Sequence, residues 1–441
     1  MAGARLINDE DPTCRKLCAK CIKEMITRIP HNQRTKLFDI VVEWLRDNKI
    51  MHRTLAAQLC GIFVTVEKET FECRLKEILP LLLKQFHANF DNKDMPGRFV
   101  RLRTPQETAK VEMQANIKDP ERMKDHHIFQ VLQLLLKISA NCTAFFKSEE
   151  YNESIRSFAE YCQSLLAHPH IWVRLAASQM IGFILAALDV EKIIDLLENP
   201  EKNEMEIGYM YSDPAAVIRS LTLDLIAQLQ PDVTFEELAD QTIKNLIFIA
   251  RILKSIKGSS TVAVDQDDEM KDRSQLSLSW LVRRLRKAVN VEITQAPKSG
   301  TVRTAFFKWV AGAVATIPME YLSPLLFNIM SPIVREMSNM GENNTALRRL
   351  AKEAAVMIKK RLGSEEYARL LSRIQQKLDI KKAERRKMRT QQFVTDPELA
   401  AKRKIARQQK KKEAKKRKMN TMKGKKVMRK RPKKEVDLDV I

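Results

Sequence analysis

The chain contains few of the residues that other folds need for sharp turns. Its 441 residues include only 11 glycines, and aromatic residues make up 6% of the composition. All-β proteins depend on tight turns and on aromatic strands, so this composition argues against them. Hydrophobic residues account for 44% of the chain, which is enough to bury a sizeable core. The composition therefore favours a helical protein.

Long uncharged apolar runs are also missing. No stretch of about 18 residues is free of both charge and proline, as a membrane-spanning helix would require. The closest is Ile171–Val190, but Arg174 and Gln179 within it fit a buried helix better. The first ten residues turn acidic where the apolar part of a secretory signal would begin. We therefore expect neither a membrane partner nor secretion.

The sequence has no motif of catalytic chemistry. Gly-Lys occurs only at Gly424-Lys425, inside a basic segment, so a phosphate-binding loop is not expected. No Ser-His-Asp or paired-carboxylate pattern rises above chance. We predict a non-enzymatic scaffold that uses no cofactor and no small-molecule substrate.

Three of the seven cysteines, Cys14, Cys18 and Cys21, are spaced like metal ligands. This spacing places them on one face of a single helix, whereas zinc needs a fourth ligand and usually a turn between ligand pairs. We predict that they pack in the core, because free cysteine is among the most buried residue types. His126-His127 and His168-x-His170 fall at predicted helix starts or turns, where capping and surface roles are common. We therefore predict no metal site. The odd, unpaired cysteines indicate cytosol or nucleus.

Apolar residues recur at i, i+3, i+4 and i+7 along most of the chain. This periodicity predicts helices over residues 13–29, 33–46, 51–66, 69–90, 128–146, 154–167, 171–188, 214–228, 235–256, 276–289, 302–316, 322–337 and 345–362. We expect the first four to form two pairs, 128–146 to stand alone, and the next four to form two more pairs. Helix pairs repeated in this way indicate an α-solenoid over residues 1–362. Irregular loops are predicted at about 91–125 and 258–273.

A weak internal repeat supports the solenoid. Two predicted helices share an early arginine, a glutamine five residues later and a glycine eight residues later, and these positions are Arg53, Gln58 and Gly61, then Arg174, Gln179 and Gly182. An echo follows Arg303, where Ala311 and Gly312 occupy the small positions. We expect each arginine to reach the carbonyls of the preceding turn or an acidic partner, and each glycine to let a neighbouring helix approach closely. The pattern resembles the second helix of HEAT repeats.

The carboxy-terminal residues differ sharply in charge from the rest. Residues 380–441 contain 25 Lys/Arg and 7 Asp/Glu, whereas the remaining residues contain 53 and 48. An apolar stripe predicts a docking helix at 363–380, and 381–441 should be a basic tail, partly helical or disordered, with a helix restart at Asp396-Pro397. Such a tail stays solvated unless a polyanion neutralises it, which favours RNA or DNA contact. A solubilising or nuclear-import role is the alternative, and both can hold.

Two sets of tail residues are candidates for these roles. The predicted nucleic-acid-binding residues are Lys402, Arg403, Lys404, Arg407, Lys410, Lys411, Lys412, Lys415, Lys416, Arg417 and Lys418. The predicted bipartite nuclear-import signal comprises Lys415, Lys416, Arg417, Lys418, Lys425, Lys426, Arg429, Lys430, Arg431, Lys433 and Lys434. Phe393 is the only aromatic residue after Tyr367, so phosphate contact should dominate over base stacking.

Three stretches resemble the carboxy-terminal part of a known family. They are Arg5-Leu-Ile-Asn-Asp with Pro12-x-Cys-Arg-Lys, then Arg53-x-Leu-Ala-Ala-x-x-Cys-Gly-Ile-Phe-Val64, and the tail from Phe393-Val-Thr-Asp-Pro397 to Ala414-Lys-Lys-Arg-Lys418. The family is the large HEAT-repeat component of the small-subunit processome, also called down-regulated in metastasis. Its members are several times longer, so we expect this chain to be a fragment or a partial gene product.

The resemblance implies a nucleolar scaffold. It would support early pre-rRNA cleavages that release the 18S rRNA, and its partners would be pre-ribosomal RNA, a small nucleolar ribonucleoprotein and other processome proteins. A HEAT-repeat nuclear transport receptor is the main rival, but the basic carboxy terminus argues against it, because those receptors resemble acidic superhelices. A chromatin or phosphatase scaffold is a third possibility.

Overall fold

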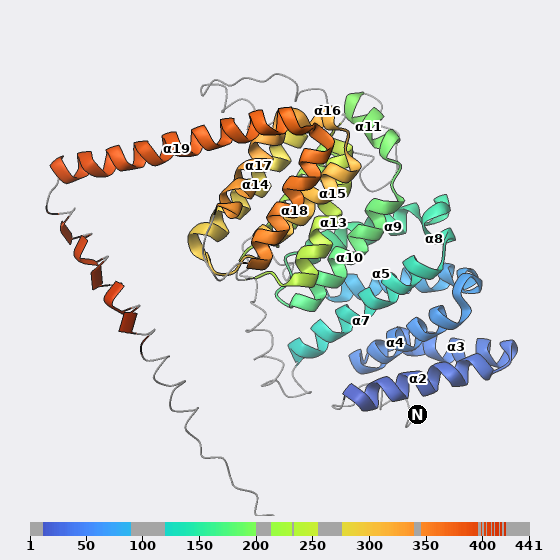
Figure 1. Cartoon of the computed structure of the whole chain (residues 1–441). Helices are drawn as coiled ribbons and strands as arrows, with labels where there is room; N and C mark the ends of the chain where they lie inside the picture. Colours follow the sequence, from blue (N-terminus) through green and yellow to red (C-terminus); the bar gives the residue numbers. More distant parts are fainter. Residues whose placement is uncertain are drawn as a thin grey trace, which may run out of the picture. The chain divides into compact units, whose positions relative to one another are not determined.

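The computed structural model describes residues 12–89, 120–199, 213–231, 233–254, 276–338 and 345–395, with short stretches between 398 and 419. The chain divides into two compact units, Met1–Leu370 and Leu371–Ile441. Within the described residues, regular structure consists of α-helices and short 3-10 helices, without a strand. The prediction of an all-α fold is confirmed (Figure 1).

The helices of the first unit form two layers. In the layer that we call the first layer, six helices pack side by side in chain order, each against the next. They are α4 (Ile50–Glu67), α7 (Pro120–Asn141), α10 (Ile171–Ala187), α13 (Glu236–Leu253), α15 (Thr301–Thr316) and α18 (Thr345–Leu362). At the start of this layer, α2 (Pro12–Arg28) packs on α4.

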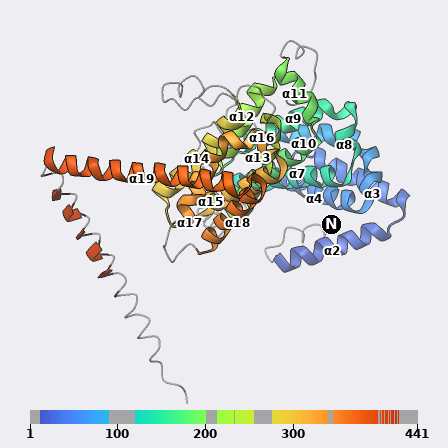
Figure 2. The same cartoon turned by 45° about the horizontal axis from the view of Figure 1, so that its top comes forward.

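The second layer covers one side of the first. Each of its helices packs against the first-layer helix that follows it in sequence. Figure 2 shows the array turned by 45° from the view of Figure 1. They are α3 (His31–Arg46), α5 (Leu75–Asn89), α9 (Asn152–Leu165), α12 (Pro214–Ala227), α14 (Leu278–Gln295) and α17 (Leu326–Met337). Shorter elements connect them: η1 (Lys68–Arg74), α8 (Ala144–Lys147), η2 (Glu149–Tyr151), α11 (Val190–Glu198), α16 (Met319–Leu322) and η5 (Ser323–Leu325). Helix pairs stacked in two layers confirm the predicted HEAT-like α-solenoid.

The pairing of the first helices differs from the prediction. The segments 51–66 and 69–90 were expected to pair, and 128–146 to stand alone. In the structure α4 pairs with α3, and α5 pairs with α7. The turn η1 separates α4 from α5, and its Phe71 is fully buried against Phe38, at a ring-centroid distance of 5.7 Å. The long segment between α5 and α7 conceals their partnership in the sequence.

Other elements also differ from the prediction. Helix α7 begins at Pro120 rather than near 128, because proline suits the first position of a helix. The predicted helix 322–337 is divided into α16, η5 and α17, with Pro324 in the first turn of η5. Helix α11 was not predicted. Its cap is Asp189, whose carboxylate accepts from the backbone N–H groups of Glu191 and Lys192 at 3.0 and 3.2 Å.

The core lies between the two layers and contains mostly Leu, Ile, Val and Phe side chains. Taken singly, none of the described helices is long and apolar enough to cross a membrane. Helices α10 and α11 meet the length and hydropathy criterion only as a pair, and they are bent by 81° at the break between them.

Candidate nucleic-acid interface

The basic region begins on a long helix, α19 (Ser364–Thr395). It follows Gly363, whose φ of 93° lies in the left-handed region that favours glycine and ends α18. In its first turn, Glu365 and Glu366 accept hydrogen bonds from Arg369 at 2.5 and 2.7 Å. The helix ends immediately before Asp396-Pro397, where the sequence predicted a break. The residue before a proline is biased away from helical geometry, which accounts for this end.

The last turns of α19 carry basic residues that the list of candidates omitted. Five of them are exposed, and between Ile380 and Thr395 the only acidic residue is Glu384. They are Lys381, Lys382, Arg385, Arg386 and Lys387. The apolar stripe fades after Ile380, so this segment was predicted to belong to the tail. Its lack of glycine and proline and its many Lys, Arg and Gln residues are the signal that would have predicted a continuous helix.

Six of the predicted nucleic-acid-binding residues lie in helical stretches, and all six are exposed: Lys402, Lys404, Lys411, Lys412, Lys415 and Lys416. The other five, Arg403, Arg407, Lys410, Arg417 and Lys418, are outside the described residues. So are all predicted import-signal residues after Lys418, which are Lys425, Lys426, Arg429, Lys430, Arg431, Lys433 and Lys434. Hydrated lysines on an exposed helix can bind phosphates electrostatically, with little selectivity for sequence.

The repeated arginines lie near the starts of first-layer helices, as predicted. Arg174 is fully buried, and its Nη1 donates to the carbonyls of His168 and Pro169 at 3.0 and 2.9 Å. Its Nη2 donates to the Val233 carbonyl of the next pair at 3.3 Å. Burial lowers the pKa of Arg174 to about 10. The arginine thus joins the turn before its own helix to the neighbouring repeat.

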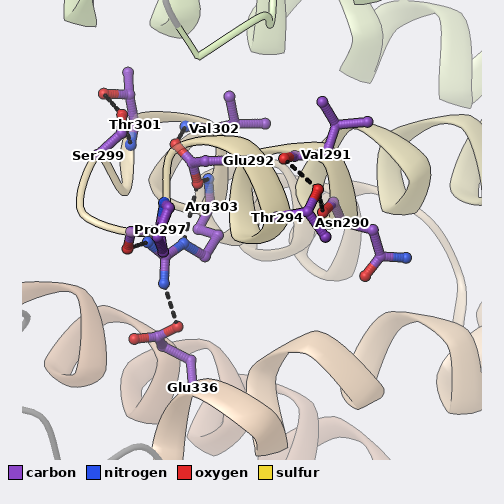
Figure 3. Close-up of polar contacts among 10 residues, drawn as sticks. All are labelled: Asn290, Val291, Glu292, Thr294, Pro297, Ser299, Thr301, Val302, Arg303 and Glu336. Carbon is purple, nitrogen blue, oxygen red and sulfur yellow. Dashed lines mark hydrogen bonds and ion pairs between the residues drawn. The ribbon is translucent and has the colours of Figure 1, made fainter. Parts of the chain in front are cut away.

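Arg303 binds acidic partners as well as a carbonyl (Figure 3). Its Nε donates to Glu292 of α14 at 3.0 Å, and its Nη1 donates to Glu336 of α17 at 2.7 Å. Its Nη2 donates to the Pro297 carbonyl at 2.8 Å. Glu292 also accepts from the backbone N–H groups of Val302 and Arg303, at 2.9 and 3.0 Å. All three charged side chains are buried, so this cluster fixes three helices around one guanidinium group.

The repeated glycines lie where helices touch, as predicted. A Cβ atom on Gly61 would be 2.9 Å from Lys137 Nζ of α7, and one on Gly182 would be 2.6 Å from Gln241 Nε2 of α13. A Cβ atom on Gly312 would lie 2.3 Å from Ile247 Cδ1, also of α13. In each case the neighbour belongs to an adjacent helix of the first layer.

The interpretation of the cysteines was wrong in one respect. Cys14 and Cys18 are only partly buried and Cys21 is exposed, because α2 lies at the edge of the first layer and packs mainly on α4. Burial, followed by the proximity of Cys14 and Cys21, raises the pKa of Cys18. In the described part of the chain, no group of three or more His, Cys, Asp or Glu residues is placed to hold a metal ion.

The two histidine pairs serve different roles. His170 is the N-cap of α10, and its Nδ1 accepts from the Trp172 backbone N–H at 3.3 Å. His127 was expected at a helix start or on the surface, but it is fully buried because α7 begins earlier than predicted. Its ring nitrogens lie 3.1 Å from Thr54 Oγ1 and 3.2 Å from Gln85 Oε1. Burial, followed by the charges of Arg53 and His126, lowers the pKa of His127 to about 3.

The sequence of this chain is similar to those of known proteins. Residues 106–421 match the family model described as small subunit processome component 20 homolog, C-terminal. The U3 small nucleolar RNA-associated protein 20 of Schizosaccharomyces pombe is 23% identical to this chain over 403 residues. That alignment covers 90% of this chain but only 14% of the relative. The family model thus covers the helices from α7 onward and all of the predicted RNA-binding residues from Lys402 to Lys418.

Proposed function

Because this chain belongs to the small subunit processome component 20 family, we propose that it is a non-catalytic scaffold of the small-subunit processome. In this role it supports early processing of the 18S rRNA precursor and assembly of the small ribosomal subunit. Its partners are pre-ribosomal RNA, a small nucleolar ribonucleoprotein and other processome proteins, and it works in the nucleolus. The observation that carries the proposal is the match of the family model over residues 106–421.

The two-layer array supports a scaffold role. Stacked helix pairs present extended surfaces on which several partners can be held in a fixed relation. The domain arrangement that we propose is an array over 1–362, a docking helix over 363–380 and a basic tail over 381–441. In the tail, the exposed Lys402, Lys404, Lys411, Lys412, Lys415 and Lys416 bind RNA phosphates together with their neighbours.

The salt dependence of RNA binding tests the tail. If about eight phosphates are neutralised, the slope of log K against log salt for single-stranded RNA should be about −5 to −6. Changing the six exposed tail lysines to Gln should reduce this slope strongly, and unrelated RNAs should bind alike. Replacing the same number of lysines elsewhere, on α2, α3 and α5, is the matched control. A slope near zero, or a strong preference for one sequence, contradicts RNA binding by the tail.

The location of the protein in the cell tests the import signal. Deletion of residues 405–441 should move the protein out of the nucleus or nucleolus, because both basic clusters are then lost. Unchanged nucleolar accumulation would mean that the array, through its partners, determines the location instead.

A pull-down separates the scaffold from its main rival, a HEAT-repeat nuclear transport receptor. The proposal predicts that the native protein recovers pre-ribosomal RNA and processome proteins. Recovery of import cargo without rRNA precursor would favour the transport receptor.

A further inference from the structure

One surface of the second layer gathers basic residues from two helices whose own glutamates are buried. Helices α14 and α17 pack against each other, and their only acidic residues are Glu292 and Glu336. Both glutamates are buried on Arg303, in the cluster of Figure 3. The remaining charged residues of the two helices are basic and at least partly exposed, and we call them the α14–α17 basic face: Arg283, Arg284, Arg286, Lys287 and Arg335.

Two guanidinium groups of this face, those of Arg284 and Arg286, are held in position by their neighbours. Trp280 is buried, and Arg284 lies 5.5 Å from its ring centroid. Arg219 of α12 lies 5.8 Å from the same ring. On the other flank of α14, Arg286 Nη1 donates to Asn328 Oδ1 of α17. These arginines therefore lose little conformational entropy when they bind an anion, in contrast to flexible surface lysines.

The burial of Arg286 adds a second reason to expect an anion. Burial lowers the pKa of Arg286, and no described carboxylate forms an ion pair with it. Among the described residues, no carboxylate forms an ion pair with Arg284 or Lys287 either. A partly desolvated guanidinium group without an acidic partner is stabilised when an external anion approaches, because a fork of N–H donors matches phosphate oxygens.

We propose that the α14–α17 basic face is a second RNA-binding surface, which contacts the phosphodiester backbone without reading base sequence. The choice of RNA over an acidic protein rests on the proposed function. This surface belongs to the array, whereas the predicted RNA-binding lysines belong to the tail. The chain would then hold RNA at two separate places, one of them fixed to the repeats.

Variants of the full chain test this surface through salt dependence. The triple variant Arg284→Gln/Lys287→Gln/Arg335→Gln removes three of its cations. Loss of three phosphate contacts should reduce the magnitude of the log–log salt slope by about 2 for a single-stranded RNA of about 20 uridines. The control Lys36→Gln/Lys84→Gln/Lys147→Gln makes the same change in net charge at exposed second-layer and α8 positions, and should leave the slope unchanged. Equal slopes for the two variants overturn the proposal.

A chemical footprint on the unmodified chain guards against a folding defect in the triple variant. Saturating oligouridylate should protect Lys287 from acetylation severalfold, while Lys36 and Lys84 remain equally reactive. Unchanged labelling of Lys287, or protection by polyglutamate but not by RNA, overturns the proposal. If the tail variant weakens binding while the face variant does not, the proposed function survives and this inference fails. If neither variant changes RNA binding, both proposals fail.

Discussion

The first and last parts of the array use the repeated arginine in different ways. Near the start, Arg53 Nη1 donates to the neutral amide of Gln85 at 3.1 Å. Gln85 in turn contacts the neutral His127 and donates to the Leu45 carbonyl at 3.1 Å. Near the end, Arg303 binds two buried carboxylates. The arginine at the same position in the repeat thus donates to a neutral amide in one region and to two carboxylates in the other.

This difference shows which feature of the repeated arginine is common to all three sites and which varies. What the sites share is a guanidinium group that joins a helix start to an adjacent element, and Arg174 does this with carbonyls alone. The partner chemistry varies because each neighbouring helix supplies whatever polar group reaches the arginine. The two regions should therefore respond differently to substitution and to pH.

The largest expected effect is at the charged site. Replacing Arg303 by Met leaves Glu292 and Glu336 buried without a cation, which should destabilise the protein by about 3–5 kcal/mol. Replacing Arg53 by Met removes one hydrogen bond from a partly exposed arginine, which should cost about 1 kcal/mol. Chemical denaturation followed by circular dichroism measures both. Similar losses for the two variants would remove the distinction between the regions.

A second substitution sharpens this result. In the Arg303→Met background, Glu336→Leu removes one of the two uncompensated carboxylates. It should therefore restore part of the lost stability, whereas the same change in the unmodified protein should be destabilising. A double-mutant cycle gives the coupling between these two residues.

The next effect concerns acid stability in the first region. His127 has a folded pKa of about 3, compared with an ordinary value of 6.5. The unfolded chain therefore binds a proton first, and the stability contributed above pH 6.5 is lost progressively as the pH falls toward 3. At pH 4.5 the loss from this one residue should be about 2–3 kcal/mol.

His127→Gln isolates this contribution, because the carboxylates that titrate in the same range are present in both proteins. The difference in unfolding free energy between pH 7 and pH 4.5 should be smaller in the variant by about the same amount. An identical pH dependence would mean that His127 binds its proton in the folded protein over the same pH range as in the unfolded chain.

The smallest expected effect concerns the glycines of the two repeats. A Cβ atom at Gly61 meets the flexible end of Lys137, whereas one at Gly182 also meets Asn245 Oδ1 at 2.9 Å. Asn245 is buried, and its Nδ2 donates to the Ser178 carbonyl at 2.8 Å, so it cannot move freely.

Gly61→Ala should be neutral or slightly stabilising, because alanine favours the helix by about 0.5–1 kcal/mol. Gly182→Ala should instead destabilise by about 1–2 kcal/mol through overpacking. Thermal or chemical unfolding measures the stability of both variants. A larger loss for Gly61→Ala than for Gly182→Ala would show that the Asn245 side chain moves easily to make room.

Sequence periodicity predicted most helices and the close approach at Gly61 and Gly182. It failed on pairing, because apolar spacing shows that a helix is buried but does not show which helix covers it. The segment between α5 and α7 separated two partners, so α7 was predicted to stand alone. The burial of His127 depended on the start of α7, and a shift of a few residues at that boundary moved the side chain into the core.

The sequence predicted which segment of the candidate interface is basic, but it did not predict how basic residues from different helices are brought together. The excess of lysine and arginine after residue 380 is evident from the sequence, and the break at Asp396-Pro397 is too. The run Arg283-Arg-Leu-Arg-Lys287 is evident in the sequence, but its position beside Arg335 of α17 is not. Only the structure shows that Glu292 and Glu336 are buried on Arg303, which leaves the basic residues as the exposed charges of the two helices.

The cluster around Arg303 also bears on how the array comes apart. In a stack where each repeat touches only its neighbours, partial unfolding spreads inward from an end, one helix pair at a time. Glu292, Arg303 and Glu336 tie α14, α15 and α17 together, so opening beyond α18 has to break a buried ion pair at each further step. We expect this cluster to stop unfolding that begins at α18 from spreading into the rest of the array. Amide hydrogens of α18 should then exchange with solvent well before those of α15.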